Sequence, residues 1–157
     1  MSDESTRATV EKTASELLAA AGLRRTRARE SLLALLYESD RPLSHQEIAE
    51  KPGGAEFDRV TLYRTMATLE QAGLIHRVQG VDGFWRFSGH SLEAPGCPGD
   101  HPHFLCLDCG RMTCLKDQSL PWVSVPHESQ VYGKQLVVYG RCPACSRKEA
   151  QKGKPDE

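Results

Sequence analysis

Hydrophobic residues recur at helical spacing in the first part of the chain, in segments that end at turn or capping residues. The first segment, Ser5–Ala21, is followed by Gly22, which suits a helix C-terminus. Thr26 is a suitable N-cap for a second amphipathic helix, and Pro42 interrupts the chain after it. The pattern therefore predicts two helices before residue 42.

Two further helices are predicted from capping residues and apolar spacing. Ser44 can cap a short helix over residues 44–50, with Glu47 in place to complete a capping box. Asp58 can cap a longer helix over residues 58–72, because apolar residues recur along it and Gly73 follows.

A hairpin follows these helices. Two runs of β-forming residues, Leu74–Gln79 and Phe84–Ser88, are joined by Gly-Val-Asp-Gly, which is a strong turn signal. The order of three helices, a longer helix and a hairpin is that of a winged helix-turn-helix, which we assign to residues 1–88. The alternative is a small α/β domain with no role in nucleic-acid binding.

The rest of the chain divides into a linker and a smaller domain. Residues 89–100 are rich in Gly and Pro and predict a linker, and residues 101–157 form the second domain. Within it, His103–Leu107 and Leu136–Tyr139 are strand candidates. The charged tail from Ser146 is expected to fray. An α+β fold follows.

Composition favours a soluble globular protein, with 39% hydrophobic and 26% charged residues. No apolar run approaches the roughly 20 residues that span a bilayer, and the polar start does not resemble a secretory signal, so we expect a cytoplasmic protein. A net charge of -1 gives no overall nucleic-acid signal. Basic charge is local, in a cluster of four arginines: Arg24, Arg25, Arg27 and Arg29.

The cysteines give the sharpest chemical signal, because none of the 6 precedes residue 97. Cys106 and Cys109 form one CxxC pair and Cys142 and Cys145 another, each after a predicted strand. Two such pairs can build a closed tetrahedral site for a structural Zn²⁺. The alternative is a redox pair, but a redox CxxC normally opens a helix, and neither pair is predicted to do so.

A second group of histidines and cysteines surrounds the first pair. Its members are His76, His90, Cys97, His101, His103 and Cys114. Alternation along a strand would place His101 and His103 on one face. Imidazole and thiolate ligands suit Zn²⁺, whereas Mn²⁺ and Fe²⁺ prefer harder oxygen ligands. Singly, each residue fits a surface histidine or a buried thiol; together they predict a second metal site.

The predicted helix over residues 58–72 carries polar and amphipathic groups at its N-terminal end. They are Arg59, Thr61, Tyr63 and Arg64. The N-terminal end of a recognition helix enters the major groove, where arginine can read guanine and hydroxyl groups can bind phosphate. Tyr63 has the alternative of a core position.

Four segments together resemble the ferric uptake regulator (Fur) family, and most closely its zinc uptake regulator (Zur) branch. They are Gly22–Arg29, Val60–Thr65, Ala72–His76 and His101–Gly110, with the second CxxC after Val138-Tyr139-Gly140. The resemblance implies an N-terminal winged helix, a C-terminal α/β dimerisation domain with a structural zinc site, and a homodimer that binds a palindromic operator when metal is present.

The resemblance also implies roles for individual metal ligands. The two CxxC pairs resemble the family's structural zinc site, and His101 and His103 resemble ligands of its regulatory site. Cys114 stands where iron- and peroxide-sensing members usually have Asp or Glu. His76 stands where zinc-sensing relatives place a ligand from the wing.

Other implied roles concern the linker and DNA. The linker ligand is either His90 or Cys97, of which Cys97 has the more family-like distance to His101. Tyr63 and Arg64 fall on DNA-contacting positions of the recognition helix. Arg24 falls on a basic contact near the start of the DNA-binding domain.

The chain departs from the family pattern in three places. At residues 41–42, Arg-Pro replaces a histidine that iron and peroxide sensors use. Pro102 and Lys134 cannot serve as ligands of the family's auxiliary metal site. Pro121 and Pro126 lie in a short stretch between the CxxC pairs, which argues against the usual long dimerisation helix.

The sequence thus predicts a non-enzymatic, Zn²⁺-dependent repressor of metal-homeostasis genes, with Fe²⁺ or Mn²⁺ as alternative regulatory metals. Its expected partners are double-stranded operator DNA and a second copy of itself, with no membrane and no small-molecule substrate. The rivals are an iron- or peroxide-responsive regulator and a zinc-ribbon interaction module without DNA binding. A zinc hydrolase is disfavoured because the chain has no HExxH motif.

Overall fold

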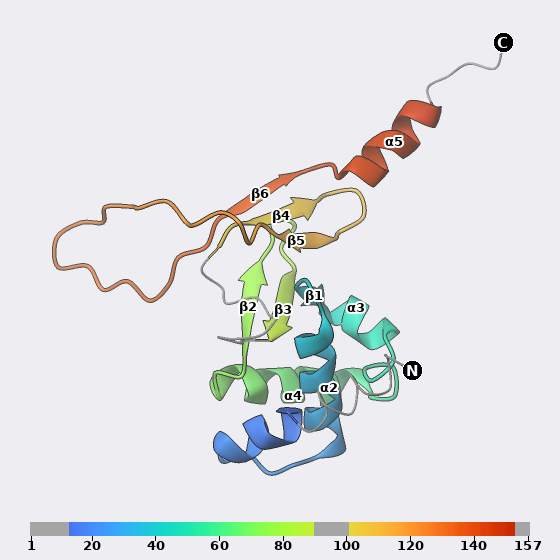
Figure 1. The fold of residues 1–157 in the computed structure, drawn as a ribbon, viewed down its shortest axis with the longest axis vertical. Helices are drawn as coiled ribbons and strands as arrows, with labels where there is room; N and C mark the ends of the chain where they lie inside the picture. The colour runs from blue at the N-terminus through green and yellow to red at the C-terminus, as the bar shows by residue number, and fades with distance from the viewer. Residues whose placement is uncertain (1–12, 90–100, 153–157) are drawn as a thin grey trace.

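The computed structural model describes residues 13–89 and 101–152 (Figure 1). Its N-terminal part is helical: residues 13–20 form a helix, followed by α2 (Arg27–Glu38), α3 (His45–Glu50) and α4 (Arg59–Gln71). The predicted helix start at Ser5 lies outside the described residues.

The predicted helix caps are confirmed. The Thr26 hydroxyl accepts from the backbone N–H of Arg29, and Asp58 accepts from the first turn of α4. Ser44 and Glu47 form a complete capping box at α3. Each such cap stabilises a helix by about 1 kcal/mol, which explains why short helices start where the sequence indicates.

The hairpin is also confirmed, and it pairs with a strand that the sequence pattern missed. β2 (Ile75–Gln79) and β3 (Trp85–Gly89) pair antiparallel, and β1 (Leu43–Ser44) adds to β3, giving the order β1-β3-β2. With the helices, this sheet forms a winged helix-turn-helix (Figure 1). Its core is apolar and continuous: Leu32, Leu36, Ile48, Leu62, Leu69 and Phe87 are all buried.

Gly89 belongs to the wing and not to the linker, which corrects the predicted linker start. It pairs with Ile75 at the end of the β2–β3 ladder. A Cβ at this position would lie 2.5 Å from the Tyr37 ring, so the close approach of the ring requires glycine. The remaining linker residues, 90–100, lie outside the described residues.

A second sheet forms the C-terminal part. β4 (His103–Cys106) lies between β5 (Met112–Cys114), which is antiparallel to it, and β6 (Val137–Gly140), which is parallel. β5 was not predicted because it has only three residues. The tail was predicted wrongly in part, since α5 (Pro143–Lys152) continues through residues expected to fray. Pro143 at the start of α5 suits the first turn of a helix.

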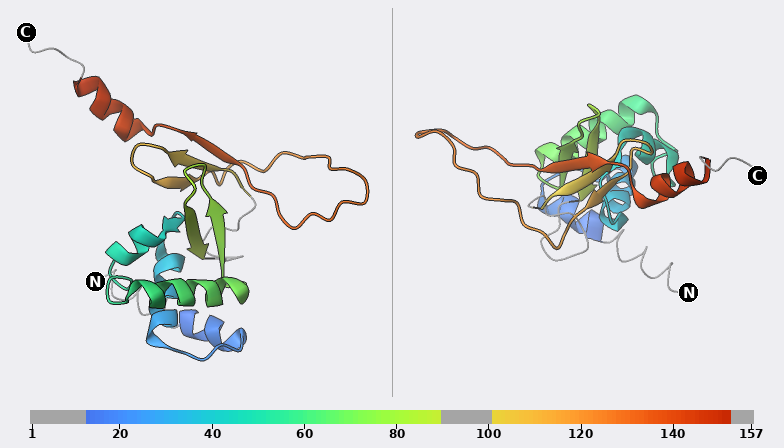
Figure 2. Two further views of the ribbon diagram at one scale, coloured as in Figure 1. Left: turned by 180° about the vertical axis from the view of Figure 1, so that it is seen from behind. Right: turned by 90° about the horizontal axis from the view of Figure 1, so that it is seen from above.

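The stretch between β5 and β6, residues 115–136, is called the arm here. It contains turns but no helix or strand, in agreement with the prolines in it. Lys134 Nζ donates to the Pro121 carbonyl at 2.8 Å and ties the two sides of the arm together. Figures 1 and 2 show the arm extending away from the sheet, on the side opposite α5.

The wing is the part of the N-terminal domain that contacts the second sheet. Val78 of β2 is buried against Leu105 and Met112 in a small core of its own. Figure 2 shows the hairpin standing between the helices and the second sheet. Within the described ranges, none of the helices combines the length and apolarity that crossing a membrane requires.

Candidate metal centres and nucleic-acid interface

The two CxxC pairs converge on one site. Their four sulfur atoms, from Cys106, Cys109, Cys142 and Cys145, all lie within 4.8 Å of one another. Parallel pairing of β4 and β6 causes this convergence, because it sets Cys106 opposite Gly140, two residues before Cys142. The Cys142 backbone N–H donates to Cys106 Sγ at 3.3 Å.

The electrostatics of this cluster favour a thiolate at its buried corner. Burial would raise the pKa of Cys106, but the backbone N–H groups of Cys109, Cys142 and Asp108 lower that pKa to about 6. Hydrogen bonding to Cys142 raises the pKa of Cys145 to about 12. Such a cluster suits a divalent cation, because cysteine ligands lose their protons when they bind a metal.

One argument against a redox pair fails, because the second CxxC does open a helix. Cys142 directly precedes α5, and Cys145 lies in its first turn. The convergence of all four sulfurs supplies a stronger argument, since a redox CxxC acts as an isolated pair. Arg141 bridges the two pairs through ion pairs with Asp108 at 2.5 Å and with Glu149. The cluster is therefore compatible with a structural zinc site.

A second ligand group lies at the start of the same sheet. His101, His103 and Cys114 offer ligand atoms within 4.8 Å of one another. His103 and Cys114 are Cα partners across the β4–β5 ladder, and the His101 and His103 rings lie 4.8 Å apart. The Leu115 backbone N–H donates to the Pro102 carbonyl at 2.9 Å, which holds the His101 segment beside the end of β5. Both histidines are buried.

The other predicted ligands are not part of this group. His76 lies half-buried on β2, opposite Ser88. The wing contacts the second sheet further along β2, at Val78, which explains why His76 is not in the group of three. His90 and Cys97 lie outside the described residues.

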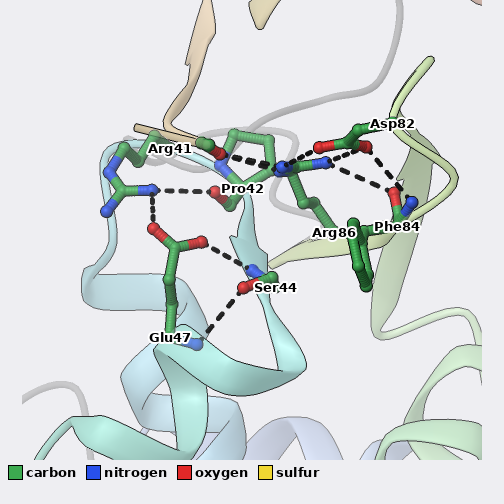
Figure 3. Close-up of polar contacts among 8 residues, drawn as sticks. Arg41, Pro42, Ser44, Glu47, Asp82, Phe84 and Arg86 are labelled. Carbon is green, nitrogen blue, oxygen red and sulfur yellow. Dashed lines mark hydrogen bonds and ion pairs between the residues drawn. The ribbon is translucent and has the colours of Figure 1, made fainter. Parts of the chain in front are cut away.

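Residues 41–42, where iron and peroxide sensors have a histidine, take part in polar contacts at the start of α3. Arg41 Nη1 lies 2.8 Å from Glu47 Oε1 and donates to the Pro42 carbonyl at 3.3 Å (Figure 3). This arrangement braces the capping box of α3. Arg41 and Pro42 therefore contribute to packing and helix capping in this chain.

The N-terminal end of α4 presents polar groups to solvent. Arg59 and Arg64 are exposed, and Tyr63 is 61% exposed, which excludes the core position considered for it. Thr61 is engaged in the helix cap, because its hydroxyl donates to Asp58 Oδ2 at 2.6 Å. The exposed edge of this helix has the composition that a major-groove reader requires.

His45 is a neighbour of this face that the sequence pattern did not identify. Its ring stacks on Tyr63, with centroids 4.5 Å apart and planes 13° apart, and it meets Phe87 edge-on at 4.7 Å. The stacked His45 ring therefore fixes the orientation of the exposed Tyr63 side chain. No sequence signal points to it, because His45 and Tyr63 lie on different helices.

Most of the arginines in the cluster at the start of α2 form ion pairs or hydrogen bonds within the protein. Arg25 pairs with Glu30 at 2.6 Å, and Arg27 pairs with Glu56. Arg29 donates to the backbone carbonyl of Arg24 at 2.6 Å. The side chain of Arg24 is exposed and remains the member of the cluster best placed to meet another molecule.

Known proteins with the same architecture support a shared fold. The chain is 26% identical to the ferric uptake regulation protein of Campylobacter jejuni over 144 residues, covering 87% of this chain and 88% of that protein. Solved structures include the Vibrio cholerae ferric uptake regulator, with a TM-score of 0.58, 22% identity and coverage of 81% and 98%. A zinc uptake regulator complexed with zinc and DNA has a TM-score of 0.56, 19% identity and coverage of 92% and 97%.

The family match covers most of the chain. A model of the family described as the ferric uptake regulator family matches residues 20–130, which include α2 to α4, the wing hairpin, the first CxxC pair and the His101, His103 and Cys114 group. Members of this family are metal-responsive, DNA-binding transcription regulators that bind operator DNA as dimers. The chain belongs to the ferric uptake regulator family.

Proposed function

We propose that this regulator is a zinc-responsive repressor of the zinc uptake regulator branch. The observation that carries the proposal is the ligand group of His101, His103 and Cys114. Two imidazoles and a thiolate are borderline-soft donors, which suit Zn²⁺ better than Fe²⁺ or Mn²⁺. The names of several relatives refer to iron, but donor chemistry is a property of this chain and outweighs a relative's name.

The two metal centres have different roles in this proposal. Cys106, Cys109, Cys142 and Cys145 hold a structural Zn²⁺ that fixes the end of the second sheet. His101, His103 and Cys114 form the core of a regulatory site, to which His76 and either His90 or Cys97 add ligands. These residues would hold a Zn²⁺ that links β4 and β5 to the segments that approach them.

The regulatory effect comes from where the ligands stand in the chain. His103 begins β4 directly after the linker, and Cys114 ends β5 beside it. His76 belongs to the wing. Drawing His76 toward the pair would fix the DNA-binding domain against the second sheet, so metal affinity and operator affinity rise together by linkage.

DNA contact is assigned to α4 and to the basic residue before α2. Arg59, Tyr63 and Arg64 form the exposed edge that enters the major groove, and Arg24 binds the phosphate backbone. The Thr61 hydroxyl contributes indirectly, because its hydrogen bond to Asp58 stabilises the start of α4. Because operators of bacterial regulators lie in the cytoplasm, we place the protein there.

The arm and β6 are assigned to the dimer. Trp122 is 91% exposed and Tyr132 is 94% exposed, and β6 leaves its outer edge open within the described sheet. Large exposed aromatic residues and an open sheet edge mark a surface that another chain covers. A second copy is the natural occupant, since a palindromic operator requires two identical DNA-binding domains.

Selection of DNA from a random duplex pool, with and without Zn²⁺, tests the proposed function. We expect enrichment of a palindrome only with the metal. Because most sites bind Zn²⁺ more tightly than Fe²⁺ or Mn²⁺, each ion is buffered at the free concentration that a cell maintains, and only Zn²⁺ should support half-maximal binding there. Preference for Fe²⁺ would make the protein an iron-responsive regulator. No enrichment with any of the three ions would favour a zinc-ribbon interaction module.

A further inference from the structure

The wing meets the first CxxC pair through one buried arginine. Arg86 of β3 is 2% exposed. Its Nη1 and Nη2 bind the two carboxylate oxygens of Asp82 at 3.0 and 2.7 Å, within the wing (Figure 3). Its Nε and Nη2 donate to the carbonyl of Gly110 at 3.2 and 2.8 Å, across to the second domain. The guanidinium therefore fastens one domain to the other.

The acceptor of this bond has a position set by the cysteine cluster. Gly110 directly follows Cys109 and has a φ of +71°, a conformation that favours glycine. Its N–H donates to the Cys106 carbonyl at 2.9 Å, closing the turn that carries both cysteines. The direction of the Gly110 carbonyl thus depends on whether this turn is closed.

The junction is tightly packed as well as hydrogen-bonded. A Cβ on Gly80 would lie 2.4 Å from Asp82 Oδ1, 2.6 Å from Arg86 Nη1 and 3.0 Å from Leu105 Cδ2. Gln79 and Gln135 exchange two hydrogen bonds beside it, at 3.4 and 3.0 Å. Hydrogen bonding to Arg86 lowers the pKa of Asp82, so the carboxylate stays charged at neutral pH.

We propose that Arg86 is a positioning residue that transmits the closed state of the cysteine cluster to the DNA-binding domain. With the CxxC turn closed, its Gly110 carbonyl receives Arg86 and fixes the angle of the wing. Without the closed turn, Arg86 keeps only its partners within the wing. The junction is then held only by the Val78 contacts and the Gln79–Gln135 hydrogen bonds, which fix the angle of the wing less strictly. The cysteine cluster then takes part in operator recognition and does not only support the fold.

The proposal rests on the proposed operator binding, and it differs from a purely local role for Arg86 in a measurable way. A local role stabilises the hairpin turn through Asp82 and affects each DNA-binding domain separately. A positioning role affects the relation between two domains of a dimer. Binding to a single half-site reports the first, and binding to the full palindrome reports the second.

The test compares Arg86→Lys with wild-type protein at saturating Zn²⁺ and matched salt. Lysine keeps the charge beside Asp82 but cannot reach both acceptors with a planar fork. We expect affinity for the full operator to fall about tenfold, within the range of allosteric couplings, while half-site affinity changes less than about twofold. An unchanged full-operator affinity, or equal losses on both DNAs, would overturn the proposal.

Gly80→Ala provides a second variant that leaves the arginine in place. Gly80 is not in the left-handed region, so its backbone conformation permits alanine, and the added Cβ displaces the Asp82–Arg86 pair and Leu105 at the junction. It should reproduce the loss on the full operator. Gln151→Ala is the control, because Gln151 is exposed on α5, away from the wing and the arm.

Hydrogen–deuterium exchange tests the junction without DNA, so failure of the proposed function and failure of this inference can be told apart. In Arg86→Lys, exchange should rise both in the wing turn, residues 80–84, and in the CxxC turn, residues 106–111. Gly80→Ala should raise exchange in the same two turns, because a Cβ at that position crowds Arg86 and Leu105. Unchanged exchange of residues 80–84 in both variants would contradict the inference.

Discussion

His103 and Cys114 face each other directly across the β4–β5 ladder, in register as Cα partners. Directly opposed residues of an antiparallel pair project to the same face of the sheet, so these two ligand atoms are brought together by strand pairing alone. The second sheet therefore presents a partly formed site before any other segment approaches. Ligands from the wing or the linker would complete it, which is the arrangement that a regulatory centre requires.

Loss of one cysteine from the cluster of four should remove its zinc. Cys142→Ser should yield aggregated or monomeric protein that lacks one Zn²⁺ per protomer, because structural zinc contributes roughly 10–16 kcal/mol in small zinc domains. Metal analysis and gel filtration measure both effects. Gln151→Ala, a change at an exposed position of α5, serves as the control. A soluble, zinc-free dimer that still binds DNA would contradict the assignment.

Removal of the exposed arginine of α4 should weaken operator binding without changing the fold. If Arg64 reads a base, Arg64→Ala should cost about 1–3 kcal/mol of binding free energy at matched salt. Fluorescence anisotropy gives the affinity, and thermal unfolding checks the fold. Arg147→Ala on α5 removes an exposed arginine from the other domain and should have little effect. Equal affinities for the Arg64 variant and wild type would show that α4 is placed wrongly on DNA.

Removal of exposed aromatic residues from the arm should shift the oligomeric state. Trp122→Ser combined with Tyr132→Ser should convert a dimer to a monomer at micromolar concentration, because buried aromatic side chains dominate interface energies. Analytical ultracentrifugation measures the mass. Phe84→Ser in the wing removes an exposed aromatic residue from a different surface as a control. The arm is not the interface if the double variant sediments like the wild type.

Acid should destabilise the DNA-binding domain through His45. Burial lowers the pKa of His45 below 6.5, and its Nε2 has no hydrogen-bond partner within the described part of the chain. The neutral ring is favoured in the folded state, so its stabilising effect is complete above pH 6.5. It is lost as the pH falls below that value, because the unfolded chain takes up the proton first.

Urea unfolding between pH 7.5 and pH 5 checks this prediction. The wild type should lose more stability on acidification than His45→Phe, which keeps a ring against Tyr63 but cannot be protonated. His127→Gln, in the exposed arm, should follow the wild type and controls for changes shared by all variants, metal release included. Parallel curves for wild type and His45→Phe would argue against a neutral, buried histidine.

Local chemistry explains which features could be predicted from the sequence. Thr26, Ser44 and Asp58 cap helices through bonds to neighbouring residues, and the turn at residues 80–83 joins adjacent strands, so each leaves a local pattern. α5 was missed because its residues are mostly exposed and polar, which resembles a frayed tail.

Contacts between distant segments left no such pattern. Arg86 and Gly110 lie 24 residues apart, and the acceptor is a backbone carbonyl that any residue could supply. The His45–Tyr63 stack joins two helices in the same way. By contrast, the CxxC pairs were identifiable because ligand spacing is itself local, although their convergence depends on parallel pairing of β4 and β6.

The central claim is that His101, His103 and Cys114 form the core of a regulatory zinc site, and Cys114→Ser tests it most directly. Operator binding should be titrated against buffered free Zn²⁺ for this variant and wild type, with zinc per protomer measured in parallel. We predict that the variant keeps its fold and structural zinc but needs at least about tenfold more free Zn²⁺. Loss of a group that only supports a metal ligand already lowers metal affinity by about tenfold or more, and loss of the ligand itself should lower it at least as much. Half-maximal binding of both proteins at the same free Zn²⁺ would contradict the account.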